Sequence, residues 1–141
     1  MSTTFEGGCF CGAVRYRIRD PFGAVYCHCR MCQRVHAAPV VAWVAAPAGG
    51  LEIIAGTPRV LASSERGERI FCGTCGTHIS CRHADDQWSV SVTLATLDDP
   101  ASIVPVAHIW TASRLPWFDT RDELPRREDG PFPAAVDASM K

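Results

Sequence analysis

The 141-residue sequence lacks several features that would place it in a large class of proteins. It contains no apolar run close to the ~18 residues that a membrane-spanning helix needs. Its first residues, MSTTFEGGCF, have neither the basic nor the apolar segment of a secretory signal peptide. We therefore expect a cytoplasmic protein that has no membrane partner.

The chain also carries almost no excess charge of either sign. Its formal net charge is -1 at pH 7, which argues against a nucleic-acid partner held by bulk electrostatics. Lysine is nearly absent, since Lys141 is the only one and the other basic residues are arginines. The preference for arginine over lysine is explained either by a compositional bias or by a need to bind anions. Anion binding needs support from the local context of each arginine. The hydrophobic content of 47% and the length suit one domain with a packed core.

Long helical periodicity is missing, and alternation with period two takes its place. In AVRYRIR (13–19) apolar residues alternate with arginines, and in QWSVSVTLA (87–95) Trp88 and the valines alternate with serines. Further short strands are expected in PVVAWVA, LEII, RVLA, RIF, THIS and IVPVAHIW, with helical turns at 30–36 and around 98–102. The sequence thus predicts a mainly β single domain of short antiparallel strands, with Trp43 and Trp88 in its core.

The composition changes toward the C-terminus. From Thr120 onward the chain is charged and rich in proline, as in TRDELPRREDGPFPAAVDASMK. We expect residues 1–124 to form the β domain and residues 125–141 to form an irregular tail. Roughly the last ten residues of this tail are expected to be mobile.

Eight cysteines are the most informative residues of the chain. In a reducing compartment, clustered cysteines bind metal more often than they form disulfides. The pairs Cys9-x-Cys11 and Cys72-x-x-Cys75 can each aim two sulfurs at one ion, because strand residues i and i+2 point to the same side and a tight turn does the same for C-x-x-C. Together the pairs form the closed four-thiolate set that is typical of a structural zinc site.

A redox function is the competing interpretation of Cys72-x-x-Cys75. A redox C-x-x-C belongs at the start of a helix in a βαβ unit, which stabilises a thiolate. Here RIF precedes the pair and THIS follows it, so the pair is expected in a β-hairpin. The sequence context therefore favours metal binding.

A second cluster, in YCHCRMC (26–32), supplies Cys27, Cys29 and Cys32. Three thiolates leave a tetrahedral zinc with one free position, which is the arrangement of catalytic rather than structural sites. His28 lies between two of these cysteines and should point away from their ion by strand alternation. Cys81 is either a small buried apolar residue or a fourth ligand that would close the site and make it structural.

The order of these clusters resembles the glutathione-dependent formaldehyde-activating enzyme family, which also includes centromere protein V. The resemblance is carried by GGCFCGAVRYRI, YCHCRMCQRV, RIFCGTCGTHIS and HIWTASRLPWF, and it runs from about residue 7 to about residue 124. It implies a β-tent type fold with a structural zinc on the first and last cysteine pairs. It also implies a second, more labile zinc at the reactive centre, on the middle three cysteines. In the namesake enzyme, glutathione and formaldehyde combine to S-(hydroxymethyl)glutathione, a carbon–sulfur lyase reaction written in reverse.

These features predict an enzyme that holds a small thiol such as glutathione at the second zinc and joins it to an aldehyde. Arg30 and Arg34, next to the second cluster, are the candidates for binding the carboxylates of glutathione, or else they belong to a solvated turn. The alternative is a non-catalytic, zinc-stapled β module that binds a partner or a small ligand, and ligation by Cys81 would favour it. Trp110 and Trp117 are expected to pack in the core or a lid, with a place in a pocket as the other possibility.

Overall fold

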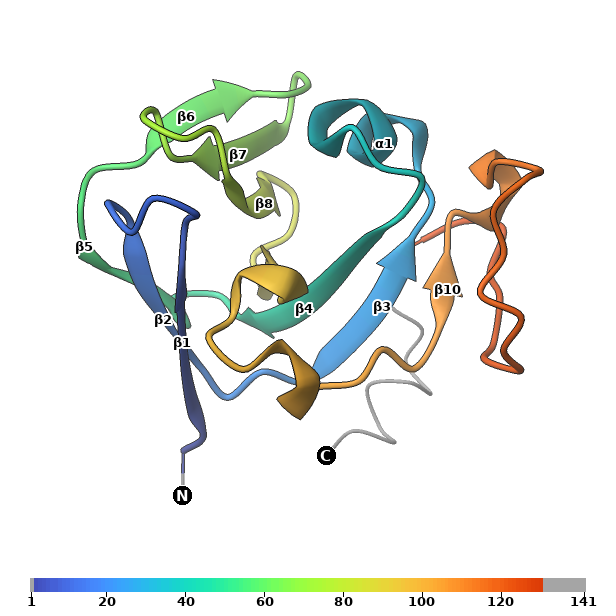
Figure 1. The fold of residues 1–141 in the computed structure, drawn as a ribbon, viewed down its shortest axis with the longest axis horizontal. Helices are drawn as coiled ribbons and strands as arrows, with labels where there is room; N and C mark the ends of the chain where they lie inside the picture. The colour runs from blue at the N-terminus through green and yellow to red at the C-terminus, as the bar shows by residue number, and fades with distance from the viewer. Residues whose placement is uncertain (1, 131–141) are drawn as a thin grey trace.

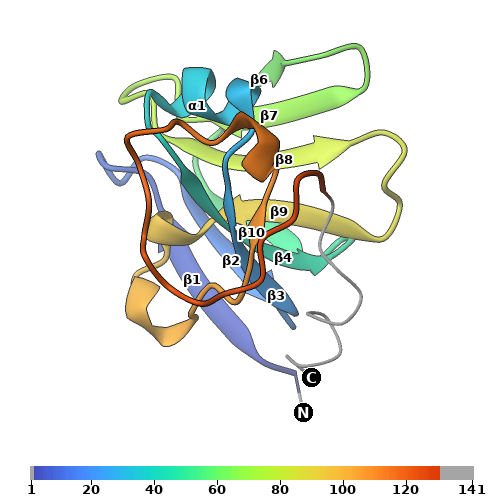
Figure 2. The same cartoon turned by 90° about the vertical axis from the view of Figure 1, so that its right-hand side faces the viewer.

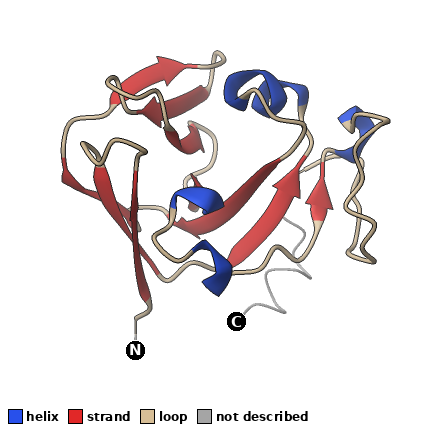
Figure 3. Ribbon diagram, viewed as in Figure 1, coloured by secondary structure: helices blue, strands red, loops and turns tan. Residues whose placement is uncertain are grey.

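The structure, a computed structural model, describes residues 2–130, and within them ten short strands form two sheets (Figure 1; Figure 3). The three-stranded sheet has the order β1-β2-β5, with β1 (Thr4–Gly8), β2 (Arg15–Arg19) and β5 (Leu51–Ala55). The seven-stranded sheet has the order β10-β3-β4-β9-β8-β7-β6. Its strands are β3 (Gly23–Cys27), β4 (Val41–Pro47), β6 (Arg59–Ala62), β7 (Gly67–Phe71), β8 (His78–His83), β9 (Ser89–Thr93) and β10 (His108–Ile109).

Helical structure is short, and only part of it lies where the sequence predicts it, at 30–36 and around 98–102. The helix α1 (Arg30–His36) occupies the expected turn after the second cysteine cluster. Three 3₁₀ helices follow later in the chain: η1 (Leu94–Thr96), η2 (Pro100–Ser102) and η3 (Thr111–Ser113). The mainly β prediction is confirmed. No helix within residues 2–130 is long and apolar enough to cross a membrane.

Strand β2 has the alternating faces that its sequence predicts. Tyr16 and Ile18 are completely buried, whereas its arginines lie on the outer face. There Arg17 pairs with Glu6 of β1 at 2.7 Å, and a similar arginine–carboxylate pair joins β2 to β5. Such exposed pairs contribute little each, so burial of the apolar face is what fixes the register of this strand.

The central strand β4 is apolar on both faces because both faces of the large sheet are covered. Val44 and Ala46 belong to a core that also contains Cys9 and Cys72, between the two sheets. Val41 and Trp43, which point the other way by strand alternation, belong to a second core with Cys27 and Cys32. The two cysteine groups therefore lie on opposite faces of the same strand.

Two expectations about strands are wrong. Trp88 is not in the core, because a turn ends just before β9 and leaves its side chain 84% exposed. The Asp86 carboxylate holds this turn by accepting the backbone N–H groups of Trp88 and Ser89 at 2.9 and 3.0 Å. The expected strand IVPVAHIW shrinks to the two residues of β10, which pair in parallel with β3.

The segment after β10 returns alongside it (Figure 2). The His108 N–H donates to the Pro125 carbonyl at 2.8 Å, and the Arg127 N–H donates to the His108 carbonyl at 2.9 Å. Residues 125–130 are irregular apart from an isolated bridge between His108 and Arg126. These bonds show that the packed chain continues past residue 124, while the rest of the expected tail, 131–141, lies outside the described residues.

Candidate metal centres and cavity

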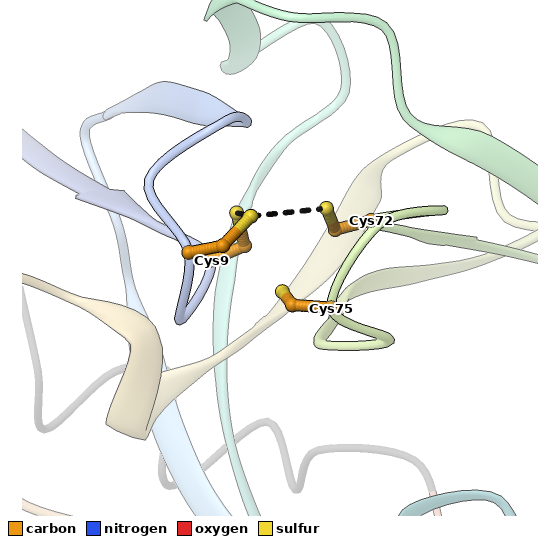
Figure 4. A group of neighbouring side chains, drawn as sticks. Cys9, Cys72 and Cys75 are labelled. Atoms are coloured by element: carbon orange, nitrogen blue, oxygen red, sulfur yellow. Dashed lines mark hydrogen bonds between the residues drawn. The ribbon is translucent and has the colours of Figure 1, made fainter.

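Two tight loops bring the first and last cysteine pairs together. In the loop after β1, the Val14 N–H donates to the Cys9 sulfur at 3.2 Å, and Gly12 has a φ of +81°. In the loop after β7, the Gly76 N–H donates to the Cys72 carbonyl at 2.8 Å, and Gly76 has a φ of +83°. Only glycine takes this left-handed conformation readily, so both turns depend on it. Figure 4 shows Cys72 and Cys75 facing Cys9 across the gap between the loops.

The sulfur separations in this group match a tetrahedral metal site. The Cys9 and Cys11 sulfurs are 3.6 Å apart, the Cys11 and Cys72 sulfurs are 3.8 Å apart, and all four lie within 4.8 Å of one another. A tetrahedron with zinc–sulfur bonds of ~2.3 Å has sulfur–sulfur edges of about 3.8 Å. The cysteines are unbonded thiols, and Cys72-x-x-Cys75 lies in the β7–β8 hairpin rather than at a helix start. The donor set thus fits a four-coordinate zinc.

The second cysteine group is built by the junction of β3 and α1. Cys27 is the last residue of β3, and Cys29 is the N-cap of α1, where its sulfur accepts the Cys32 N–H at 3.2 Å. The Cys27 and Cys32 sulfurs are 3.8 Å apart, again the edge of a thiolate tetrahedron. These three sulfurs lie within 4.8 Å of one another, and Cys81 does not belong to the group. The second cysteine group therefore offers three of the four sulfur ligands that would fill a tetrahedral site.

His28 turns away from the second group, as strand alternation predicts. It is buried, and its Nε2 lies 2.8 Å from Nδ1 of His108. The His108 Nε2 in turn lies 3.1 Å from the Asp122 carboxylate. Burial, above all, lowers the pKa of His28 to about 4, so its ring is neutral at pH 7. The two rings tie the cysteine loop to the C-terminal segment.

A buried arginine that the sequence reading missed contacts the second group. Arg69 on β7 is 3% exposed, and its Nη2 lies 3.7 Å from the Cys32 sulfur. Its Nη1 lies 3.4 Å from Nε2 of His36, and its guanidinium lies over the Trp43 ring at 5.8 Å. The sequence did hold one clue to this residue. Side chains alternate between the two faces of a strand, so Arg69 must lie on the face of β7 opposite Ile70.

Charge is shared unevenly within the second group. The sulfurs of Cys27 and Cys29, and after them the Arg69 guanidinium, lower the pKa of the Cys32 thiol. The sulfurs of Cys29 and Cys32, together with burial, raise the pKa of the Cys27 thiol. Cys32, next to the cation, is therefore the sulfur that holds negative charge most easily.

A cavity of about 600 Å³ opens beside the second cysteine group. Arg69, Cys81 and Ser91 are direct partners across β7, β8 and β9, so their side chains leave the same face of the sheet and form its floor. The other walls are largely apolar and include Phe22, Met31, Trp43, Trp88, Ile109 and Trp110. Of the two tryptophans expected in the core or a lid, Trp110 lines the cavity and Trp117 does not.

The structure places Arg30 and Arg34 on the exposed side of α1, where neither lines the cavity. Arg30 instead lies 3.3 Å from the Gln33 side chain through its Nη1. The arginines that line the cavity are Arg69 and Arg82. This placement gives no support to the predicted carboxylate binding by the two α1 arginines.

Comparisons with known proteins agree with the cysteine pattern. The family model of the glutathione-dependent formaldehyde-activating enzyme matches residues 4–113. The chain belongs to this family. The match includes both cysteine groups, Arg69 and Trp110. No curated protein matches the chain. A crystal structure of a Rhodobacter sphaeroides protein has a TM-score of 0.56 and 20% identity, covering 86% of this chain and 98% of that one. It shares the fold.

Proposed function

We propose that this member of the formaldehyde-activating enzyme family is a zinc-dependent carbon–sulfur lyase acting on the adduct of a small thiol and an aldehyde. Glutathione and formaldehyde are the reference pair, because the family is named for them. The observation that carries the proposal is the three-sulfur group at the wall of a cavity large enough for a small molecule.

The two cysteine groups have different chemical capacities. The four sulfurs of the first group would fill every position of a structural zinc and hold the β1–β2 loop to the β7–β8 hairpin. The three sulfurs of the second group would hold a zinc whose fourth position faces an incoming ligand. A zinc ion there lowers the pKa of a thiol below its free value of ~8.5, which makes thiolate available at neutral pH.

The reaction needs little more than orientation and charge balance from the protein. In the direction of addition, the thiol sulfur forms a bond to the aldehyde carbon, the carbonyl π bond breaks, and the thiol proton ends on the oxygen. The lyase direction reverses each change. The Arg69 guanidinium stabilises negative charge that gathers at Cys32, and the cavity walls hold the thiol with its sulfur toward the cysteines.

A cysteine substitution tests this function. Cys32→Ser should lower the zinc content from two ions to one per chain and abolish the protein's acceleration of thiol-dependent formaldehyde exchange. Exchange is measured by ¹³C magnetisation transfer between hydrated formaldehyde and the hemithioacetal. Cys81→Ser is the matched control, because Cys81 lines the same cavity but lies outside the sulfur group, and it should keep both zincs and the rate.

Two results would overturn the proposal. Undiminished exchange in Cys32→Ser protein that has lost its second zinc would separate the chemistry from the site. Loss of the second zinc in Cys81→Ser protein would mean that Cys81 is the fourth ligand and that the site is closed. A chain with two closed sites would be a zinc-stapled β module that binds a partner or ligand, the alternative function.

A further inference from the structure

The free surface of the cavity is dominated by large apolar side chains. Three of the four tryptophans in the chain line it. At its rim, Trp88 is 84% exposed, Trp110 is 43% exposed and Met31 is 40% exposed. Exposed apolar groups that gather at a cavity mark a binding surface rather than core packing. These side chains are unused by the reaction as described above.

Trp110 is held at the rim by an unfavourable backbone conformation. Its φ of 56° and ψ of 38° lie in the left-handed region, which a bulky residue rarely adopts. Its N–H donates to the Asp129 carbonyl at 3.2 Å, and its carbonyl accepts the Ser113 N–H at 3.1 Å. A Cβ on Gly130 would lie only 2.5 Å from the indole Nε1, so the C-terminal segment packs closely against the ring. Strain of this kind is typical of ligand sites.

The arginine and aspartate side chains that line the cavity have partners, although the buried Nε of Arg69 has none. The Arg69 guanidinium faces Cys32 and His36. Arg82 forms an ion pair with Glu68 at 3.1 Å. The Asp86 carboxylate accepts the N–H groups of Trp88 and Ser89. Glutathione carries two carboxylates and an ammonium group, and these cavity-lining residues offer it no matching set of free charges.

We propose that the thiol taken by this cavity carries an aromatic or branched apolar body rather than the charged tripeptide of glutathione. The inference rests on the proposed function, since the thiol enters with its sulfur toward Cys27, Cys29 and Cys32. Trp88, Trp110 and Met31 would cover the apolar body. The covalent step is unchanged: a sulfur–carbon bond forms, and the thiol proton moves to the carbonyl oxygen.

Binding is measured on the zinc-loaded 141-residue protein through quenching of tryptophan fluorescence. The probes are 2-phenylethanethiol and glutathione. We expect 2-phenylethanethiol to bind about tenfold more tightly or better, because its ring leaves water on binding. Trp88→Ala should weaken the binding of 2-phenylethanethiol about fivefold, because burial of the ring against Trp88 provides part of its tighter binding. Trp88 is so exposed that its loss should leave the fold intact. Trp117→Ala is the matched control, since Trp117 is 73% exposed, lies outside the cavity lining and should leave the affinity unchanged.

The ¹³C exchange assay, run with each thiol, separates this inference from the proposed function. Tighter binding and faster exchange with 2-phenylethanethiol support both. If glutathione binds more tightly and only its exchange is accelerated, the inference is wrong and the proposed function stands. If 2-phenylethanethiol binds as expected but neither exchange is accelerated, the proposed function fails and the apolar preference of the cavity remains. Failure of both thiols to bind, or equal weakening by Trp88→Ala and Trp117→Ala, overturns the inference.

Discussion

Replacing Arg69 with methionine isolates the effect of one buried charge on the second cysteine group. A zinc ion and three thiolates carry one net negative charge, and a thiolate in fourth place adds another. The Arg69 guanidinium lies 3.7 Å from the Cys32 sulfur and opposes that charge. Methionine keeps an unbranched side chain but removes both the charge and the hydrogen-bond donor. Arg69→Met should therefore lower the zinc affinity of the second cysteine group without affecting that of the first.

The size of the effect follows from the geometry. At 3.7 Å and an effective dielectric constant of ~20, two unit charges interact by about 4.5 kcal/mol before desolvation is counted. Hydrogen bonds to charged groups retain a net ~1.5–3 kcal/mol. A loss of about 2 kcal/mol is roughly 30-fold in affinity, within the ~10–100-fold cost of removing a group that supports a metal ligand. We therefore expect Arg69→Met to lower the zinc affinity of the second cysteine group by roughly 30-fold.

Competition with a fluorescent zinc chelator measures this affinity directly. Arg82→Met is the matched control, because Arg82 lines the same cavity but pairs with Glu68 instead of a cysteine. Release of the second zinc at the same chelator concentration in Arg69→Met and unaltered protein would refute the charge argument.

Three further perturbations test other parts of the structure. Cys72→Ser should cost about 3 kcal/mol or more of unfolding free energy through loss of the first zinc, and a chelator should lower the melting temperature of the unaltered protein far more than that of the variant. Asp122→Ala should cost about 2 kcal/mol in urea unfolding because it removes the carboxylate acceptor of buried His108 and leaves its Nε2 only the Thr120 hydroxyl at 3.2 Å; a cost near zero would show that the histidine pair does not depend on the carboxylate. Burial raises the pKa of the Tyr16 hydroxyl to about 12. The stability that the buried neutral Tyr16 contributes is therefore complete below pH ~10, the pKa of tyrosine in the unfolded chain, and it is lost as the pH rises toward the pKa in the folded protein. Tyr16→Phe should flatten the fall in unfolding free energy above pH 10, and an unchanged slope would contradict this.

Local patterns in the sequence account for much of the fold. The alternation around β2 and the turn at α1 are visible because neighbouring residues determine them. The gathering of Cys9 with Cys72 could also be predicted, since four thiolates need one ion and the pairs have metal-ligand spacing. Trp88 was mispredicted because periodicity cannot place the start of a strand, and here an Asp86 turn precedes β9.

The cavity could not be predicted from the sequence, because long-range register creates it. Arg69 becomes a neighbour of Cys32 only after β7 has paired with β8 and the large sheet has been covered by α1. Trp110 reaches the rim through a left-handed backbone held by a segment about twenty residues further on. Neither event leaves a periodic trace in the chain. Arg30 and Arg34, although close in sequence to the cysteines, are exposed on α1 and do not line the cavity.

The most direct test of the account is the coordination of the metal at Cys27, Cys29 and Cys32. Crystals of the zinc-loaded protein, with anomalous data collected at the zinc edge, would give the number of ions and the ligands of each. The account predicts two ions per chain, one held by four cysteines and the other by three, with its fourth position open to the cavity and taken by an added thiol. A Cys81 sulfur at ~2.3 Å from the second ion would close the site, and so would contradict the account.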